Sequence, residues 1–166
     1  MKEPSHLHRI LKLKMIRDQL DHTFDYPLTL VVAAMGYGKT VAVRDFLEET
    51  QADYVWLNIE SDETSVHIIW DSFSRQLTQD HPEIGHRLSS LGFPLNAAYR
   101  ERVIDLLEEW ASLSSKILVI DDYHFANLPE LDSLIDRLVR KSIPGLHILI
   151  IPRTRPAINV EELKLK

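Results

Sequence analysis

The amino-acid sequence predicts an α/β fold in which a mainly parallel β-sheet is covered by helices on both faces. Short apolar runs alternate with longer stretches in which apolar side chains recur at helical spacing, which is typical of parallel sheets. The run Ile-Leu-Val-Ile at residues 117–120 is apolar on both faces, as expected for a strand between two helical layers. The apolar run at residues 28–32 leads into a glycine-containing loop and then a helical segment. With 166 residues, the chain has the length of one domain.

The first half of the chain is predicted to contain two strands and three helices. Residues 6–20 are expected to form an amphipathic helix, because apolar side chains recur near helical spacing with Lys and Arg between them. Residues 28–32 are predicted to be the first strand and residues 39–49 the helix after the glycine loop. Residues 54–59 form the second predicted strand, and residues 66–77 carry the apolar stripe of the next helix.

The second half begins with a segment that is rich in turn residues. Prolines and glycines punctuate residues 81–94, which predicts a loop with a short helix. A long helix follows at residues 97–113, where the apolar side chains fall on one face. Residues 117–120 and 147–151 are predicted strands, and residues 131–139 form a helix between them. The chain contains neither an internal repeat nor a low-complexity segment.

Residues 33–40 read Ala-Ala-Met-Gly-Tyr-Gly-Lys-Thr and follow the first predicted strand directly, which is the pattern of a phosphate-binding P-loop, or Walker A motif. Gly36 and Gly38 can adopt backbone conformations that turn several N–H groups toward one point. Lys39 brings a positive charge to the outer phosphates, and the hydroxyl of Thr40 can ligate Mg²⁺. The start of the following helix favours an anion. The residues predicted to bind a nucleoside triphosphate are Ala34, Met35, Gly36, Tyr37, Gly38, Lys39, Thr40 and Val41.

Two carboxylates follow the third predicted strand. Asp121 and Asp122 stand at its C-terminal tip, which in a parallel sheet lies at the edge where ligands bind. We expect Asp121 to hold Mg²⁺ together with Thr40, as the Walker B motif does in P-loop proteins. Asp122 is expected to orient or deprotonate the attacking water. The alternative is a polar strand end before a turn, but the upstream Gly-Lys-Thr favours the nucleotide site.

Composition excludes several classes of function. The chain is 45% hydrophobic and 27% charged, with a formal net charge of −6 and no Lys/Arg cluster, so it is a poor candidate for binding DNA or RNA. It has no apolar stretch that is long enough to span a membrane and no signal-peptide core. It also has no cysteine, which excludes disulfides and thiolate metal sites and fits a cytoplasmic protein.

These motifs resemble the nucleotide-binding domain of the STAND class of signalling ATPases, in particular the large ATP-dependent, LuxR-type transcriptional regulators of the maltose-regulator kind. The matching stretches are residues 28–40, Val-Trp-Leu-Asn-Ile-Glu at 55–60, Leu-Val-Ile-Asp-Asp-Tyr-His at 118–124 and Arg-Thr-Arg-Pro at 153–156. Ala33 replaces the first glycine of the strict P-loop motif, and this family commonly has a small residue there. The resemblance implies a three-layer P-loop NTPase fold and a switch that binds ATP or ADP with Mg²⁺.

The resemblance also implies a sheet order in which the fourth strand lies between the first and the third. That order places Arg153 between Lys39 and Asp121, where its guanidinium would sense the γ-phosphate. The alternative is a solvated arginine at a strand end, which is what we expect of Arg155. Asp122 stands where many P-loop hydrolases have a longer Glu, so we expect weak ATPase activity at most.

Family members continue into a further strand, a winged-helix domain, a helical-repeat sensor and a DNA-binding helix-turn-helix. These are not present in the 166 residues, so the chain is interpreted as an N-terminal fragment or a shortened relative. We expect one domain, with an N-terminal helical segment at residues 1–26, a nucleotide-binding core at 27–156 and a tail at 157–166. The first strand would then lie at an open sheet edge, which favours pairing with another chain, including a second copy.

Two other functions stay open on the sequence alone. A small P-loop kinase would need a lid with arginines, for which residues 87–102 are the candidate because they carry Arg87, Arg100 and Arg102. A nucleotide-binding remnant that acts as an interaction module would use the open sheet edge. His81 and His86 are interpreted as solvated loop residues rather than metal ligands.

Overall fold

The computed structural model describes residues 14–153 except residue 35, residues 60–64 and residues 124–127. Four strands form one sheet in the order β1-β4-β3-β2, and all three pairings are parallel. The predicted fold class and the position of the fourth strand between the first and the third are therefore confirmed. The strands are β1 (Leu28–Leu30), β2 (Asp53–Asn58), β3 (Lys116–Tyr123) and β4 (Leu146–Pro152).

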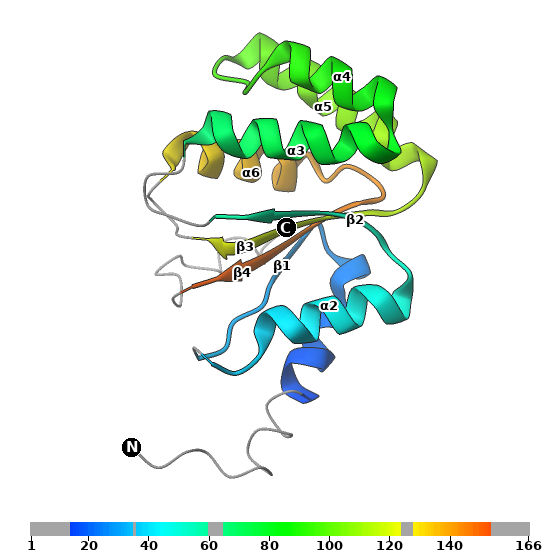
Figure 1. Ribbon diagram of the computed structural model, residues 1–166, viewed down its shortest axis with the longest axis vertical. Coiled ribbons are helices and arrows are strands. Elements are labelled where there is room, and N and C mark those ends of the chain that lie inside the picture. Colours follow the sequence, from blue (N-terminus) through cyan, green and yellow to red (C-terminus); the bar gives the residue numbers. More distant parts are fainter. Residues whose placement is uncertain (1–13, 35, 60–64, 124–127, 154–166) are drawn as a thin grey trace.

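Helices cover both faces of the sheet, which gives three layers (Figure 1). The helical residues 14–20 lie with α2 on one face, and α3 to α6 lie on the other. Among the described helices, none is long and apolar enough to cross a bilayer. The helices are α2 (Lys39–Thr50), α3 (Val66–Asp80), α4 (Pro82–Leu91), α5 (Ala97–Leu113) and α6 (Pro129–Lys141), and a short 3-10 helix, η1, spans Thr23–Asp25.

Strand β3 separates two hydrophobic cores. Ile117 and Val119 pack into the core on the α2 side, whereas Leu118 and Ile120 pack into the larger core on the other side. Successive side chains of a strand point to opposite faces, so an uninterrupted apolar run is what a strand covered on both faces requires. The prediction that residues 117–120 form a strand buried on both faces is confirmed.

The segment predicted as a loop with a short helix contains the ten-residue helix α4. Pro82 occupies the first turn, where its missing N–H is not needed. Gly85 lies inside the helix because α4 packs very closely on α3: a Cβ on Gly85 would lie 2.5 Å from the backbone nitrogen of Thr78. Gly92 follows the helix with a φ of +66°. The two glycines, which are typical of loops, instead permit close helix packing at Gly85 and end the helix at Gly92.

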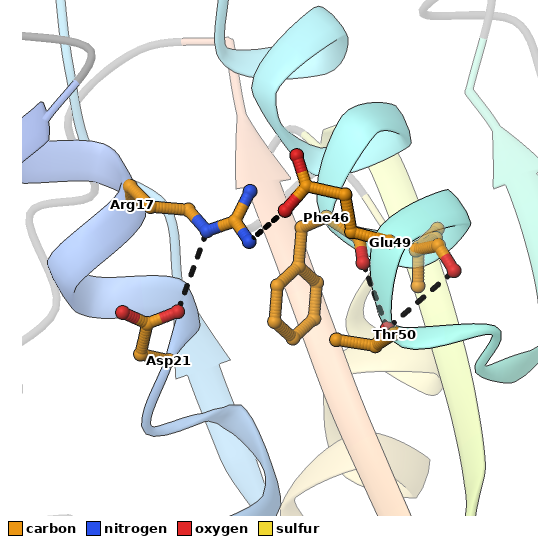
Figure 2. Close-up of polar contacts among 6 residues, drawn as sticks. Arg17, Asp21, Phe46, Glu49 and Thr50 are labelled. Atoms are coloured by element: carbon orange, nitrogen blue, oxygen red, sulfur yellow. Dashed lines mark hydrogen bonds and ion pairs between the residues drawn. The ribbon is translucent and has the colours of Figure 1, made fainter.

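The N-terminal helical residues are anchored on α2. Ile16 and Leu20 are buried in the core on that face. Figure 2 shows Arg17 directed at α2, where its guanidinium pairs with Glu49 and stands 5.6 Å from the ring centroid of Phe46. Exposed ion pairs contribute little to stability, so burial of the two aliphatic side chains is the main stabilising contribution. The first part of the predicted helix, residues 6–13, lies outside the described residues.

The two edges of the sheet differ. At the β2 edge, the side-chain amide of Gln76 donates to the carbonyl of Trp56 at 2.9 Å and accepts from its N–H at 3.3 Å, which occupies the backbone groups that another strand would use. At the other edge, within the described part of the chain, no strand pairs with the outer side of β1. The predicted position of the first strand at a sheet edge is confirmed.

Candidate functional site

The candidate site lies at the carboxyl edge of the sheet, where the loop after β1 meets the end of β3. The hydroxyl of Thr40, at the start of α2, donates to the carboxylate of Asp121 at 3.1 Å from one oxygen and 3.4 Å from the other. The two residues are 81 positions apart in the sequence. Parallel strands bring their carboxyl ends to the same edge, and β1 and β3 are separated only by β4. The structure therefore brings together the two residues predicted to ligate Mg²⁺.

The glycine loop has the backbone geometry that a phosphate site needs. Gly36 and Gly38 have φ angles of +80° and +74°, a region that other residues rarely adopt. Gly38 is the N-cap of α2, so the free N–H groups of the first helical turn face the loop. A Cβ added to Gly36 would meet no atom within 4 Å, which shows that the loop surface is open there. Tyr37 donates its N–H to the carbonyl of Ala34 at 3.3 Å and closes the turn.

Lys39 lies across this loop. Its Nζ donates to the carbonyl of Ala33 at 2.9 Å. The carbonyl is available whatever the side chain at position 33, so Ala33 in place of glycine does not disturb the contact. The methyl group of Ala33 packs against the core on the α2 side. Of the other predicted loop residues, Val41 is 60% exposed on the first turn of α2, and Met35 lies outside the described residues.

Asp121 is a carboxylate in an unfavourable environment. It is only 7% exposed, and this burial raises its pKa above the ordinary value of 3.8. The hydrogen bonds from the N–H of Asp122, at 2.9 Å, and from Thr40 act in the opposite direction. A bound cation would favour the charged form, so Asp121 is suited to sit beside a positive ion.

The donor set fits Mg²⁺. A hydroxyl and a carboxylate are hard oxygen ligands, and Mg²⁺ is usually held by one or two such groups together with water and phosphate oxygens. Among the described residues there is no cluster of three or more His, Asp or Glu side chains placed to hold a metal alone. One hydroxyl and one carboxylate would leave the remaining coordination positions of such an ion to water or to ligand oxygens.

Asp122 has an unusual backbone. Its φ of +55° lies in the left-handed region, and the pairing of β3 with β4 shifts register between Asp121 and Tyr123. Asp tolerates this conformation better than most residues, and strained positions are frequent at functional sites. The side chain of Asp122 is exposed, and its charge raises the pKa of Asp121. Its predicted action on a water molecule stays a prediction.

Arg153 directly follows β4, the strand that lies between β1 and β3. Its side chain is exposed, and its N–H contacts the carbonyl of Tyr123 at 3.4 Å. The guanidinium makes no ion pair with any residue that the structure describes. The strand order thus agrees with the expected placement of Arg153, and its role as a γ-phosphate sensor stays a prediction. Arg155 lies outside the described residues, and so do Glu60 and His124, the last residues of the matching stretches 55–60 and 118–124.

Two features of the site were not predicted from the sequence. Arg44 stacks 4.3 Å from the ring centroid of Trp56, and its positive charge lowers the pKa of Asp121. Arg44 follows Thr40 by four residues and so lies on the same face of α2. This spacing could have indicated that Arg44 lies near the site. The second feature is Tyr123, whose buried hydroxyl donates to Asp132 of α6. Burial, followed by the effects of Asp132, raises the pKa of this phenol above its ordinary value.

The other sequence candidates lie in different surroundings. Arg87 and Arg102 line a groove between α4 and α5, and Arg87 pairs with Glu109 at 2.8 Å. Arg100 donates to Ser133 of α6 at 3.2 Å. Two of the three arginines of the predicted kinase lid therefore interact with side chains of neighbouring helices, one through an ion pair and one through a hydrogen bond.

The interpretation of the two loop histidines needs correction. His81 lies between α3 and α4, only 21% of its side chain is exposed, and its Nε2 stands 3.4 Å from the Nζ of buried Lys116. It is therefore a half-buried residue at a helix junction. His86 lies on α4, where it is exposed and lines the groove with α5.

Comparison with known proteins finds regulators of transcription. No protein-family model matches the chain. It is 25% identical over 178 residues to the HTH-type transcriptional regulator MalT of Yersinia enterocolitica and 27% identical over 179 residues to that of Yersinia pestis. Each match covers 98% of this chain and 19% of the relative. The chain thus spans about a fifth of the length of these relatives, and it is distantly similar to the corresponding part of a transcriptional regulator.

Proposed function

We propose that this chain is an ATP- and ADP-binding switch domain of a LuxR-type transcriptional regulator, with Mg²⁺ bound beside the nucleotide. The observation that carries the proposal is the contact between the Thr40 hydroxyl and the Asp121 carboxylate, next to a loop whose two glycines are left-handed. The similarity to MalT over nearly the whole chain supports the regulatory part. The proposal assigns to this chain the nucleotide switch and no direct contact with DNA, in keeping with its formal net charge of −6.

Each residue of the site has a defined part in this proposal. The N–H groups of the loop and of the first turn of α2 bind the phosphates, and Lys39 exchanges its contact with the Ala33 carbonyl for one with phosphate oxygens. Thr40 and Asp121 hold the metal and its water shell. An Mg²⁺ ion held by these two residues would supply positive charge beside the phosphate oxygens. Asp122 orients a water, and Arg153 detects the terminal phosphate.

The proposal predicts that Lys39→Ala abolishes or strongly weakens nucleotide binding. A charge-assisted hydrogen bond contributes about 1.5–3 kcal/mol, which corresponds to about a 10- to 150-fold loss of affinity. The measurement is titration with a fluorescent ATP analogue, supported by calorimetry with ATP and ADP in the presence and absence of Mg²⁺. Lys141→Ala is a matched control, because Lys141 is an exposed lysine of α6 that pairs with Glu108.

Unchanged affinity in Lys39→Ala would contradict the P-loop assignment. Phosphate transfer to a metabolite, with little free phosphate released, would indicate a kinase instead. Absence of ATP and ADP binding together with a concentration-dependent dimer would indicate an interaction module.

A further inference from the structure

Tyr123 connects three elements next to the candidate site. It directly follows the two aspartates at the end of β3 and is 1% exposed. Its hydroxyl donates to the carboxylate of Asp132, which lies in the first turn of α6. Its carbonyl accepts the N–H of Arg153 at the end of β4. One residue therefore joins the end of β3 that carries Asp121, the end of β4 that precedes Arg153 and a helix that lies on the sheet.

The irregular end of β3 at Asp121 and Asp122 is the place where such an anchor acts. Asp121 itself is paired with Asn58 of β2 and Ile151 of β4, but the register of the β3–β4 pairing shifts between Asp121 and Tyr123 and leaves Asp122 outside the regular pairing. Asp122 is in a left-handed conformation that only surrounding contacts can maintain. The aromatic ring of Tyr123 is packed in the larger hydrophobic core, and its hydroxyl bonds a carboxylate, which is a strong and directional contact. These contacts fix the chain immediately after the two aspartates.

The geometry points to the Tyr123–Asp132 hydrogen bond as a positioning contact that sets the Mg²⁺-dependent part of nucleotide binding and ties the site to α6. The inference rests on the nucleotide-binding function proposed above. Tyr123 is a positioning residue rather than a catalytic one, because its hydroxyl is directed to α6 and it acts through the placement of Asp121. Loss of the hydrogen bond should loosen the Asp121 carboxylate and leave the phosphate-binding loop intact.

The test compares Tyr123→Phe with the wild type in two calorimetric titrations, one with ATP and Mg²⁺ and one with ATP and EDTA. The expected result is an affinity loss of about 3- to 10-fold with Mg²⁺ and no change with EDTA, on the scale of one hydrogen bond. Tyr99→Phe is the matched control, since Tyr99 is 41% exposed on α5. Asp132→Asn keeps an acceptor oxygen and should lower the ratio of the affinity with Mg²⁺ to the affinity with EDTA less than Asp132→Leu, which removes the acceptor.

A purely structural role makes a different prediction. Leu138→Val removes a methylene from the buried face of α6 without touching the hydrogen bond, and it should lower the melting temperature but leave the affinity ratio unchanged. If Tyr123→Phe behaves like Leu138→Val, the positioning role is refuted and nucleotide binding stands. If the wild type binds ATP in neither titration, the proposed function fails, and the positioning role fails with it.

Discussion

Replacing Asp121 by Asn should stabilise the folded chain while weakening its Mg²⁺-dependent binding of nucleotide. Asp121 is 7% exposed, and burial disfavours its charged form. Asn has nearly the same shape and no charge. Its carbonyl oxygen can accept the N–H of Asp122, and its amide can donate to the hydroxyl of Thr40, because a hydroxyl also accepts. The substitution therefore removes a buried charge without leaving a polar partner unsatisfied.

The expected gain is that of a single favourable substitution, about 0.5–2 kcal/mol in the free energy of unfolding. In a chain of 166 residues, 1 kcal/mol corresponds to about 2–4 °C in melting temperature. The loss in metal-dependent binding should be larger. Mutation of a residue in the outer shell of a metal site typically costs about 10- to 100-fold in metal affinity.

The effect on stability should depend on pH, with a definite sign. The folded-state pKa of Asp121 is raised above 3.8, so between these two values the folded chain holds a proton that the unfolded chain has released. The stability of the wild type therefore falls as the pH rises through this window and stays lower above it. The Asn variant lacks this component. The difference in melting temperature should be smallest at low pH and reach its full size above the raised pKa.

The assay is thermal unfolding followed by circular dichroism in metal-free buffer from pH 4 to 8, combined with calorimetry of Mg²⁺-ATP. Asp105→Asn, an exposed position of α5, is the control and should change stability by less than about 0.5 kcal/mol. A melting temperature of Asp121→Asn equal to or below that of the wild type at pH 7 would refute the reasoning. It would mean that the hydrogen bonds to the carboxylate outweigh the cost of burying it.

Two further predictions concern backbone geometry. Gly85→Ala should lower the free energy of unfolding by about 1–3 kcal/mol in urea titrations, because its Cβ would meet both the nitrogen and the Cα of Thr78, at 2.5 and 2.6 Å. Combining it with Thr78→Ala should not restore stability, and full recovery would place the conflict in the Thr78 side chain instead. Asp122→Gly should stay within about 1 kcal/mol of the wild type, whereas Asp122→Val should lose about 1–3 kcal/mol, because φ is +55° there. Equal losses in the two variants would show that the carboxylate, rather than the backbone conformation, matters for stability.

Much of the architecture was predictable because its signals are local. The P-loop prediction depends on eight neighbouring residues, and the positive φ angles at Gly36 and Gly38 agree with it. Helix α5 has the predicted bounds, since its apolar periodicity is regular and Asn96 caps its start. The strand order came from the family resemblance rather than from any local signal, and the sheet confirms it. In these cases a few residues suffice to specify the backbone.

Contacts between distant segments were not predictable in this way. Gly85 is typical of a turn in the sequence, because no neighbouring residue shows that the backbone of Thr78 packs against it in the fold. The amide of Gln76 on Trp56, the stacking of Arg44 and the hydrogen bond from Tyr123 to Asp132 each join separate elements. The pKa of Asp121 depends on how completely the fold buries it.

The sequence by itself determined which groups are available for phosphate and metal binding, because glycine conformation, lysine charge and carboxylate chemistry belong to single residues. Only the tertiary structure decided that the Thr40 hydroxyl donates to the Asp121 carboxylate and that the Tyr123 hydroxyl bonds Asp132 of α6 beside them. The physical reason is that burial and pairing are properties of the packed chain: they arise when parallel strands bring their carboxyl ends to one edge and helices close over both faces.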